Sequence, residues 1–300
     1  MQAEDILQRR NSSKKIIFVF FLWLISIIAI FFLHDLSVNQ AKQSGSVVMT
    51  TDALTWMADE LHMDLKGMPS SEYPLPKNYK DVERVGTPNA PSMEKIKKLN
   101  ADSVYSVTTL KDMQGDSYKA NDINVKYVNL QTVADLKKSM NMLAKKYHKE
   151  TYAQAFIDKL DKRQTSIEQE NKNRPRQRVL VLFGMPGGSY LQATSNSYIG
   201  SLVEITNNKV IEPKNSHGEY ISVNMEEIQK SKPEIVICLA HAMPETVEKS
   251  FKQEFSNKMW QSLPAFQNKK VYYLREPTYS STANMNVIKA MNGIDKIVNK

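Results

Sequence analysis

Two stretches decide the fold: SMEKIKKLNADSVYSV at residues 92–107 and NMEEIQKSKPEIVICL at residues 224–239. Aligned without gaps, they share five identical residues. Each stretch reads as a polar helix cap, a short helix, a polar turn and a buried strand. The second adds Glu227 at the third helical position after Asn224, the spacing of a capping box. A helix-to-strand unit that occurs twice predicts an α/β protein with two similar lobes.

A long helical tract separates the two copies. Its apolar residues recur at helical spacing on both sides of an expected break near Lys149: Val133, Leu136, Met140, Leu143, Tyr152, Phe156 and Leu160. Neither proline nor glycine occurs from Asp116 to Arg174, so this linking helix is expected to be rigid and to allow little hinge motion. The strand RVLVLFG at residues 178–184 then opens the second lobe.

The amino terminus predicts a membrane anchor. Residues 16–33 are almost entirely apolar and follow a basic flank, which favours a transmembrane helix with the body outside the cytoplasm. A cleavable signal peptide is the alternative, although His34, Asp35 and Leu36 are not a small-residue cleavage site. The only cysteine is Cys238, so neither an internal disulfide nor the usual lipid attachment is available. The expected organisation is a cytoplasmic basic tail at 1–15, the anchor at 16–33, a linker at 34–46, an amino-terminal α/β lobe at 47–147, a linking helix at 148–174 and a carboxyl-terminal α/β lobe at 175–300.

Composition narrows the class of function. The chain has 300 residues, of which 41% are hydrophobic and 24% charged, as expected of two globular domains. Its net charge of +8 favours attraction to anionic surfaces or ligands. It lacks the signatures of RNA-recognition and zinc-knuckle modules, so we expect no nucleic-acid partner. It also lacks G-x-S-x-G, H-E-x-x-H, Walker A and G-x-G-x-x-G motifs. These absences favour a binding protein over an enzyme.

A ligand is expected beyond the carboxyl ends of the strands, as in other open α/β sheets. His241 directly follows the second repeated strand, where Thr109 stands in the first copy. The loop with Gly187 and Gly188 follows residues 178–184, and its amides, or those near residues 50–52, suit a carboxylate or phosphate oxygen. A structural role for His241 and an ordinary turn for the two glycines are the alternatives.

Four further segments carry a family resemblance: residues 180–205 (LVLFGMPGGSYLQATSNSYIGSLVEI), 220–228 (YISVNMEEI), 235–245 (IVICLAHAMPE) and 282–291 (TANMNVIKAM). With the helix and strand at 92–107 and the long linking helix, they resemble the IsdE-type haem-binding proteins of Gram-positive ABC importers. This family belongs to the helical-backbone class of substrate-binding proteins. The resemblance implies two Rossmann-like lobes joined by a long rigid helix, with b-type haem carried in the cleft for iron acquisition. It also implies a permease, an ATPase and cell-wall haem-relay proteins as partners.

The resemblance assigns the iron ligands by position. His241 matches the family's axial histidine, but Asn89 stands where the family has its methionine, and an amide is a poor iron ligand. Met93 is the tentative second ligand, with core packing as its alternative role. A methionine from another loop (Met68, Met185 or Met243) or five-coordinate iron are the other possibilities.

Further positions follow from the same resemblance. The ligand-contacting positions implied are Thr50, Thr51, Asn89, Ser189, Tyr190, Tyr198, Tyr279 and Asn284. Glu94 and Glu226 occupy equivalent places in the two copies and are expected to dock the permease, or to stabilise the starts of their helices. Two other functions remain open: capture of a siderophore or corrinoid by the same fold, and an extracytoplasmic enzyme that modifies haem.

Overall fold

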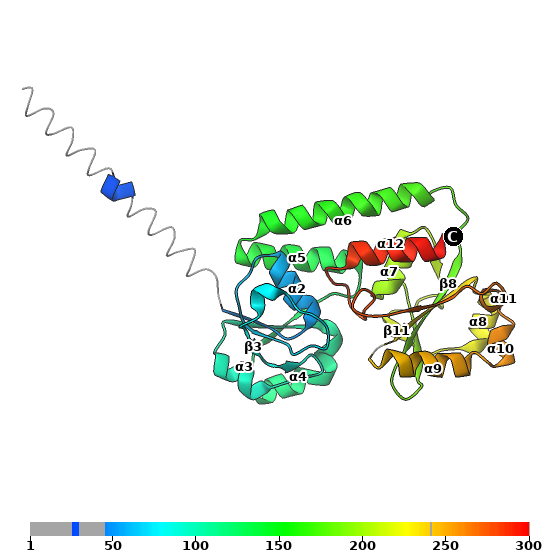
Figure 1. Cartoon of the computed structure of the whole chain (residues 1–300), viewed down its shortest axis with the longest axis horizontal. Helices are drawn as coiled ribbons and strands as arrows, with labels where there is room; N and C mark the ends of the chain where they lie inside the picture. Colours follow the sequence, from blue (N-terminus) through cyan, green and yellow to red (C-terminus); the bar gives the residue numbers. More distant parts are fainter. Residues whose placement is uncertain (1–25, 30–45, 241, 300) are drawn as a thin grey trace, which may run out of the picture. The chain divides into compact units, whose positions relative to one another are not determined.

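The structure is a computed structural model that describes residues 26–29, 46–240 and 242–299. The residues from Ser46 onward form one compact unit (Figure 1). The predicted cytoplasmic tail and most of the predicted anchor fall outside the described residues. None of the helices in the described ranges is both long and apolar enough to cross a bilayer.

The amino-terminal lobe is built on a parallel sheet with the strand order β3-β2-β1-β6-β7. Its strands are β1 (Val47–Met49), β2 (Leu65–Met68), β3 (Glu83–Arg84), β6 (Ser103–Val107) and β7 (Val125–Val128). The other elements are α2 (Asp52–Glu60), α3 (Met93–Leu99), α4 (Lys111–Ala120), the 3₁₀ turns η1 (Lys77–Tyr79) and η2 (Thr108–Leu110), and a hairpin of β4 (Gly86–Thr87) and β5 (Ala90–Pro91). The strand order reverses between β1 and β6, which is where such sheets bind ligands.

Side chains that alternate in direction along the strands divide the core of this lobe into two layers, one on each face of the sheet. Val48 and Val104 face one side, where they pack with Ile96 of α3 and Tyr118 of α4. Met49 and its neighbours on the opposite side pack against α2 and α5 (Val133–Tyr147). Because successive side chains of a strand point to opposite faces, the short apolar strands can bury both faces of the sheet.

The carboxyl-terminal lobe contains a mixed sheet with the order β11-β9-β8-β12-β13, and β10 pairs with the start of β8. Strands β8, β12 and β13 are parallel, whereas β9 runs antiparallel to β8. The strands are β8 (Arg178–Gly184), β9 (Tyr190–Ala193), β10 (Lys209–Val210), β11 (Tyr220–Ile221), β12 (Ile235–Ala240) and β13 (Val271–Leu274). The helices are α7 (Tyr198–Ile205), α8 (Met225–Ser231), α9 (Pro244–Glu254), α10 (Lys258–Gln261), α11 (Pro264–Gln267) and α12 (Val287–Val298).

The repeated helix-to-strand unit has the predicted local structure. Ser92 caps α3 by accepting a hydrogen bond from the Lys95 amide, and Asn224 caps α8 by accepting from the amides of the two residues at its second and third positions. Both helices end at a residue with left-handed backbone, Asn100 (φ 44°) and Lys232 (φ 48°). Each is followed by a buried strand, β6 or β12. The two copies therefore share their start, their end and their following strand.

Helices α5 and α6 (Glu150–Asn171) form a layer with α7 and α12 that runs across both lobes (Figure 1). The predicted break falls at His148, which has left-handed backbone (φ 56°) and separates α5 from α6. The predicted apolar positions are buried with one exception, because the Tyr152 side chain is 44% exposed. Tyr152 lies in the first turn of α6, as its helical spacing predicts, and its ring packs against His62 at 4.3 Å between centroids.

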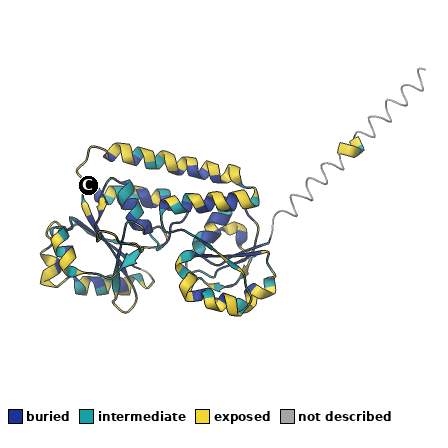
Figure 2. Ribbon diagram, turned by 180° about the vertical axis from the view of Figure 1, so that it is seen from behind, coloured by how far each residue is buried: buried dark blue, intermediate teal, exposed yellow. Residues whose placement is uncertain are grey.

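The buried residues of this layer join the cores of the two lobes. One cluster of buried apolar side chains extends from Met49 of β1 through Leu136 of α5, Leu160 of α6 and Ile294 of α12 to Val181 of β8. The buried faces of these helices are visible as dark stripes in Figure 2. Direct bonds also connect the lobes, such as the one from Gln131 to the Glu219 carboxylate at 2.6 Å. Relative motion of the lobes would disrupt this core, so the rigidity expected of the linker comes from the whole layer.

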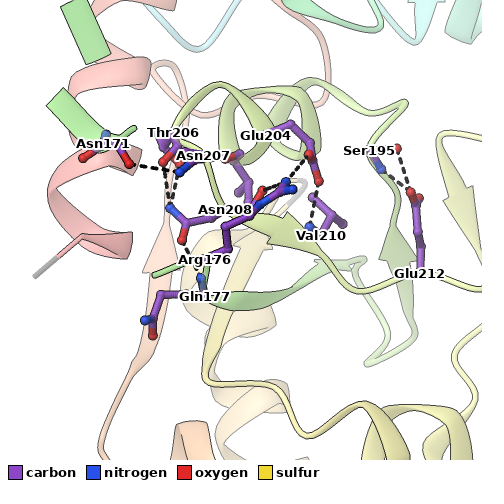
Figure 3. A network of polar contacts seen from close by, with 11 residues as sticks. Asn171, Arg176, Gln177, Ser195, Glu204, Thr206, Asn207, Asn208, Val210 and Glu212 are labelled. Atoms are coloured by element: carbon purple, nitrogen blue, oxygen red, sulfur yellow. Dashed lines mark hydrogen bonds and ion pairs between the residues drawn. The ribbon is translucent and has the colours of Figure 1, made fainter. Parts of the chain in front are cut away.

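A polar network fastens the start of the second lobe to this layer (Figure 3). Asn208 is 1% exposed, and its side chain accepts a hydrogen bond from the Gln177 amide at 2.8 Å and donates to the Thr206 carbonyl at 3.0 Å. The Asn207 side chain donates to the carbonyl of Asn171, the last residue of α6, at 2.9 Å. The end of the linking helix is thus tied to the turn between α7 and β10.

Candidate functional site

The parallel strands of the second lobe end together. Ala240 of β12 pairs with Gly184 of β8, and Leu239 pairs with Leu274 of β13. His241 is therefore the residue that directly follows the central strand, as predicted, but it lies outside the described residues. The chain then passes through two residues with left-handed backbone, Ala242 and Met243, before α9 begins. Met243 is exposed, which leaves its thioether free to meet a ligand.

An ion pair holds the neighbouring strand end against α9. Arg275 follows β13, and its Nε lies 2.7 Å from Glu248 while its Nη1 lies 2.9 Å from Glu245. The hydrogen bond and charge of Arg275 lower the pKa of the Glu248 carboxyl below its usual value. This contact positions the helix that begins just after residue 241.

The loop after β8 turns back tightly, as its two glycines predicted. Gly187 (φ 92°) and Gly188 (φ 86°) have left-handed backbone, and the Met185 amide donates to the Ser189 carbonyl at 2.9 Å. Ser189 is exposed and can meet a ligand. Tyr190 instead packs with the aromatic rings on the α9 side of the sheet, and its hydroxyl donates to Glu254 at 3.0 Å. Burial and the adjacent Glu254 raise the pKa of the Tyr190 hydroxyl.

At the matching edge of the first lobe, Thr50 and Thr51 are buried and serve the fold. The Thr50 hydroxyl donates to the Tyr105 carbonyl at 3.0 Å. Thr51 is the residue that caps α2, and its hydroxyl accepts a hydrogen bond from the Leu54 amide. Thr109, the positional match of His241, is exposed in η2.

Tyr198 and Asn284 were expected to contact a ligand, but the structure places both inside the protein. Tyr198 is 0% exposed, its hydroxyl lacks a partner within the described part of the chain, and burial raises its pKa. The Asn284 side chain accepts from the Asn286 amide at 2.8 Å and shapes the turn before α12. Both residues are buried, so a direct contact of either with a ligand stays a prediction. Tyr279 is half-buried and packs against the core.

The expected methionine ligands differ in accessibility. Met93 is half-buried and packs against the apolar cluster beneath α3, which supports its alternative role in the core. Met68 is fully buried. Asn89 is exposed in the two-residue turn between β4 and β5. Met185 lies in the loop that follows β8, and the exposed Met243 lies in the loop that follows β12, both at strand ends of the second lobe.

Sequence reasoning missed an acidic contact between the lobes. Tyr73, in the loop after β2, lies near the carboxylate of Glu276, in the loop after β13, close enough for each to perturb the pKa of the other. Burial raises the pKa of the Glu276 carboxyl. Burial also raises the pKa of the nearby Asp52 carboxyl, although the hydrogen bond from Ser71 acts in the opposite direction. The two loops follow strands of different lobes, so their meeting indicates that the strand ends confront one another.

The comparisons with known proteins agree with this geometry. The model of the periplasmic binding protein family matches residues 47–278. The high-affinity heme uptake system protein IsdE of Staphylococcus aureus is 36% identical over 272 residues, which is 89% of this chain and 92% of that protein. Its crystal structure in complex with heme is 35% identical, covers 85% of this chain and 99% of that chain, and has a TM-score of 0.81.

A crystal structure of an ABC transporter substrate-binding protein from Listeria monocytogenes EGD-e is 31% identical. It covers 85% of this chain and 98% of that chain, with a TM-score of 0.80. These matches lie among binding proteins of transport systems and not among enzymes. The chain therefore belongs to the periplasmic binding protein family and, within it, to the branch represented by IsdE.

Proposed function

We propose that this protein captures haem outside the cytoplasm and delivers it to the permease and ATPase of an ABC importer for iron acquisition. The observation that carries the proposal is the match to haem-complexed IsdE over almost the whole of that chain. The location of His241 supports it, because this residue directly follows the central strand at the edge where such sheets bind ligands. Cell-wall haem-relay proteins are the proposed donors.

We assign His241 as the axial ligand of the haem iron. Asn89 is a poor ligand, and Met243, although 57% exposed, lies only two residues from His241, too close along the chain to reach the opposite face of the same haem. Met93 stays the tentative second ligand, with core packing as its alternative role and five-coordinate iron as the alternative arrangement. The identity of axial groups sets the spectrum and potential of haem iron, so spectra distinguish these assignments.

The test is the absorbance spectrum of the purified full chain with haemin. A shifted Soret band is expected for the wild type, and it should be lost or altered in His241→Ala. Met243→Ala and Met93→Ala, compared under both oxidation states, identify the second ligand. An unchanged spectrum in His241→Ala would remove this residue from the iron. A preference for a ferric siderophore or a corrinoid in competition with haemin would favour the alternative cargo.

We also propose that Glu94 and Glu226 dock the permease. Both are exposed in the first turns of α3 and α8, the two equivalent helices of the lobes. Replacing both by Gln should reduce haem uptake by cells while leaving haem affinity unchanged. Glu150→Gln with Glu227→Gln is the matched control, because these glutamates are also exposed in first helical turns. Normal uptake by the Glu94 and Glu226 variant would refute the docking role.

The membrane anchor remains a proposal that rests on the apolar run at residues 16–33. An uncleaved anchor predicts that the protein stays in the membrane pellet after carbonate washing, with its original amino terminus. A soluble protein that begins after residue 33 would show cleavage instead.

A further inference from the structure

Two lysines and three hydroxyl groups converge on the first lobe, away from the features discussed above. The ammonium groups of Lys126 and Lys146 both bond to the Ser103 hydroxyl, at 3.0 and 3.2 Å. Lys146 also bonds to the Tyr105 hydroxyl at 2.6 Å, and the Tyr105 and Tyr147 hydroxyls lie 3.0 Å apart. We call these five residues the lysine pair site.

The fold brings these residues together from three elements. Ser103 is the first residue of β6, and Tyr105 pairs directly with Lys126 of the edge strand β7, so these two side chains share one face of the sheet. Lys146 and Tyr147 complete the last turn of α5, which packs on that face. Ser103 and Tyr105, which carry two of the three hydroxyl groups, are deeply buried, with 6% and 2% of their surface exposed. Both lysines are exposed.

The charges of the two lysines are not balanced by acidic groups. Neither ammonium forms an ion pair with a carboxylate among the described residues. The carboxylate adjacent in sequence, Asp102, accepts hydrogen bonds from the backbone and side chain of Ser46 at 2.7 and 2.9 Å and forms no ion pair with either lysine. Contact with Lys146 is the main cause that lowers the pKa of Lys126, with burial contributing. A helix carboxyl terminus favours one lysine in its last turn, but it does not account for a second from β7 directed at the same hydroxyl.

The cluster has more hydrogen-bond donors than acceptors. An ammonium group offers three donors and no acceptor, and each hydroxyl supplies one donor of its own. The three hydroxyl oxygens of Ser103, Tyr105 and Tyr147 are the acceptors that the two lysines and these hydroxyls share. Such a site is complementary to an anion with several oxygen atoms, which accepts the surplus donors and offsets the repulsion between the lysines.

We propose that the lysine pair site binds a phosphate group, supplied either by free phosphate or by an anionic lipid headgroup. The site is distinct from the haem site, because its residues lie at the start of β6 and β7 and not at the carboxyl ends of the strands. Its occupancy would be independent of haem carriage.

The test follows the Lys126 ammonium by ¹³Cε NMR in the full chain, held in an uncharged maltoside detergent. Sodium phosphate, compared with sodium chloride at equal ionic strength, should shift the Lys126 signal saturably and raise its pKa, because the bound anion favours the charged form. Lys146→Gln should abolish the saturable response, and Lys146→Arg should retain it. Lys159→Gln, which removes an exposed lysine of α6, is the matched control and should respond like the wild type.

The source of the phosphate group is identified with the chain in nanodiscs free of inorganic phosphate. A Lys126 shift with phosphatidylglycerol discs but not with phosphatidylcholine discs would identify a lipid headgroup. A response to inorganic phosphate alone would identify a soluble ligand. The proposal is overturned if phosphate produces no saturable change at Lys126, or if the change persists in Lys146→Gln while the far-UV circular dichroism is unaltered.

Discussion

Replacing Asn208 by Ala tests whether the buried polar network fastens the second lobe to the linking helices. The Asn208 side chain donates to the Thr206 carbonyl and hydroxyl and to Asn299, at 3.0, 3.1 and 3.2 Å, and accepts from the Gln177 amide at 2.8 Å. An amide group carries two N–H donors, so the three acceptors share them. The substitution therefore removes about three effective hydrogen bonds at roughly 1 kcal/mol each, a loss of about 3 kcal/mol in the free energy of unfolding.

The loss is measured by urea unfolding followed by circular dichroism, as the change in midpoint multiplied by the slope of free energy against denaturant. Asn141→Ala is the matched control, because Asn141 is exposed on α5 and its replacement should change stability by less than about 0.5 kcal/mol. A loss below about 1 kcal/mol for Asn208→Ala would refute the reasoning, since water would then be replacing the amide at this junction.

Two further predictions concern buried groups. Burial raises the folded-state pKa of Glu276 above its usual value of 4.5. The contribution of this carboxyl to the stability of the fold is therefore fully present below pH 4.5, where it is protonated, and is lost as the pH rises through the folded-state pKa. Glu276→Gln removes the buried titratable carboxyl and should raise the urea midpoint at pH 7 relative to the wild type but not at pH 4; an equal effect at both pH values would show that burial of the carboxylate charge is not the cause. Tyr198→Phe removes a buried hydroxyl without a partner in the described chain and should stabilise the protein by about 1 kcal/mol, detected as a higher Tm, whereas a lower Tm would reveal a bond to that hydroxyl.

The helix-to-strand copies were predictable because their signals are local. The caps at Ser92 and Asn224 and the polar turns after the helices lie within a few residues of the elements they delimit. The continuous core was not predictable in the same way, because Met49, Leu160 and Val181 come from distant segments and meet only after folding. Tyr152 shows the limit of periodicity, which identifies one face of a helix but not where the neighbouring core ends.

The sequence predicted where the strands next to the candidate site end, but not which side chains are buried or exposed there. The position of His241 follows from the end of one strand, whereas the contact between Tyr73 and Glu276 requires two loops of different lobes. Tyr198 and Asn284 lie in segments that resemble the haem-binding family, but a polar side chain can equally be turned inward to pack or to shape a turn. Sequence position alone does not separate these two roles.

The shared core determines how a ligand must enter and leave. Hinge closure needs a few residues that absorb backbone rotation while the lobes move as separate bodies. Here one apolar cluster includes buried residues of both lobes and the helices between them, so separating the lobes would expose that core at a cost of roughly 25 cal/mol per Å² of apolar surface. The loops after β2 and β13 meet at Tyr73 and Glu276, and Arg275 pairs with α9. We therefore infer that a ligand is captured and released with little movement of one lobe against the other.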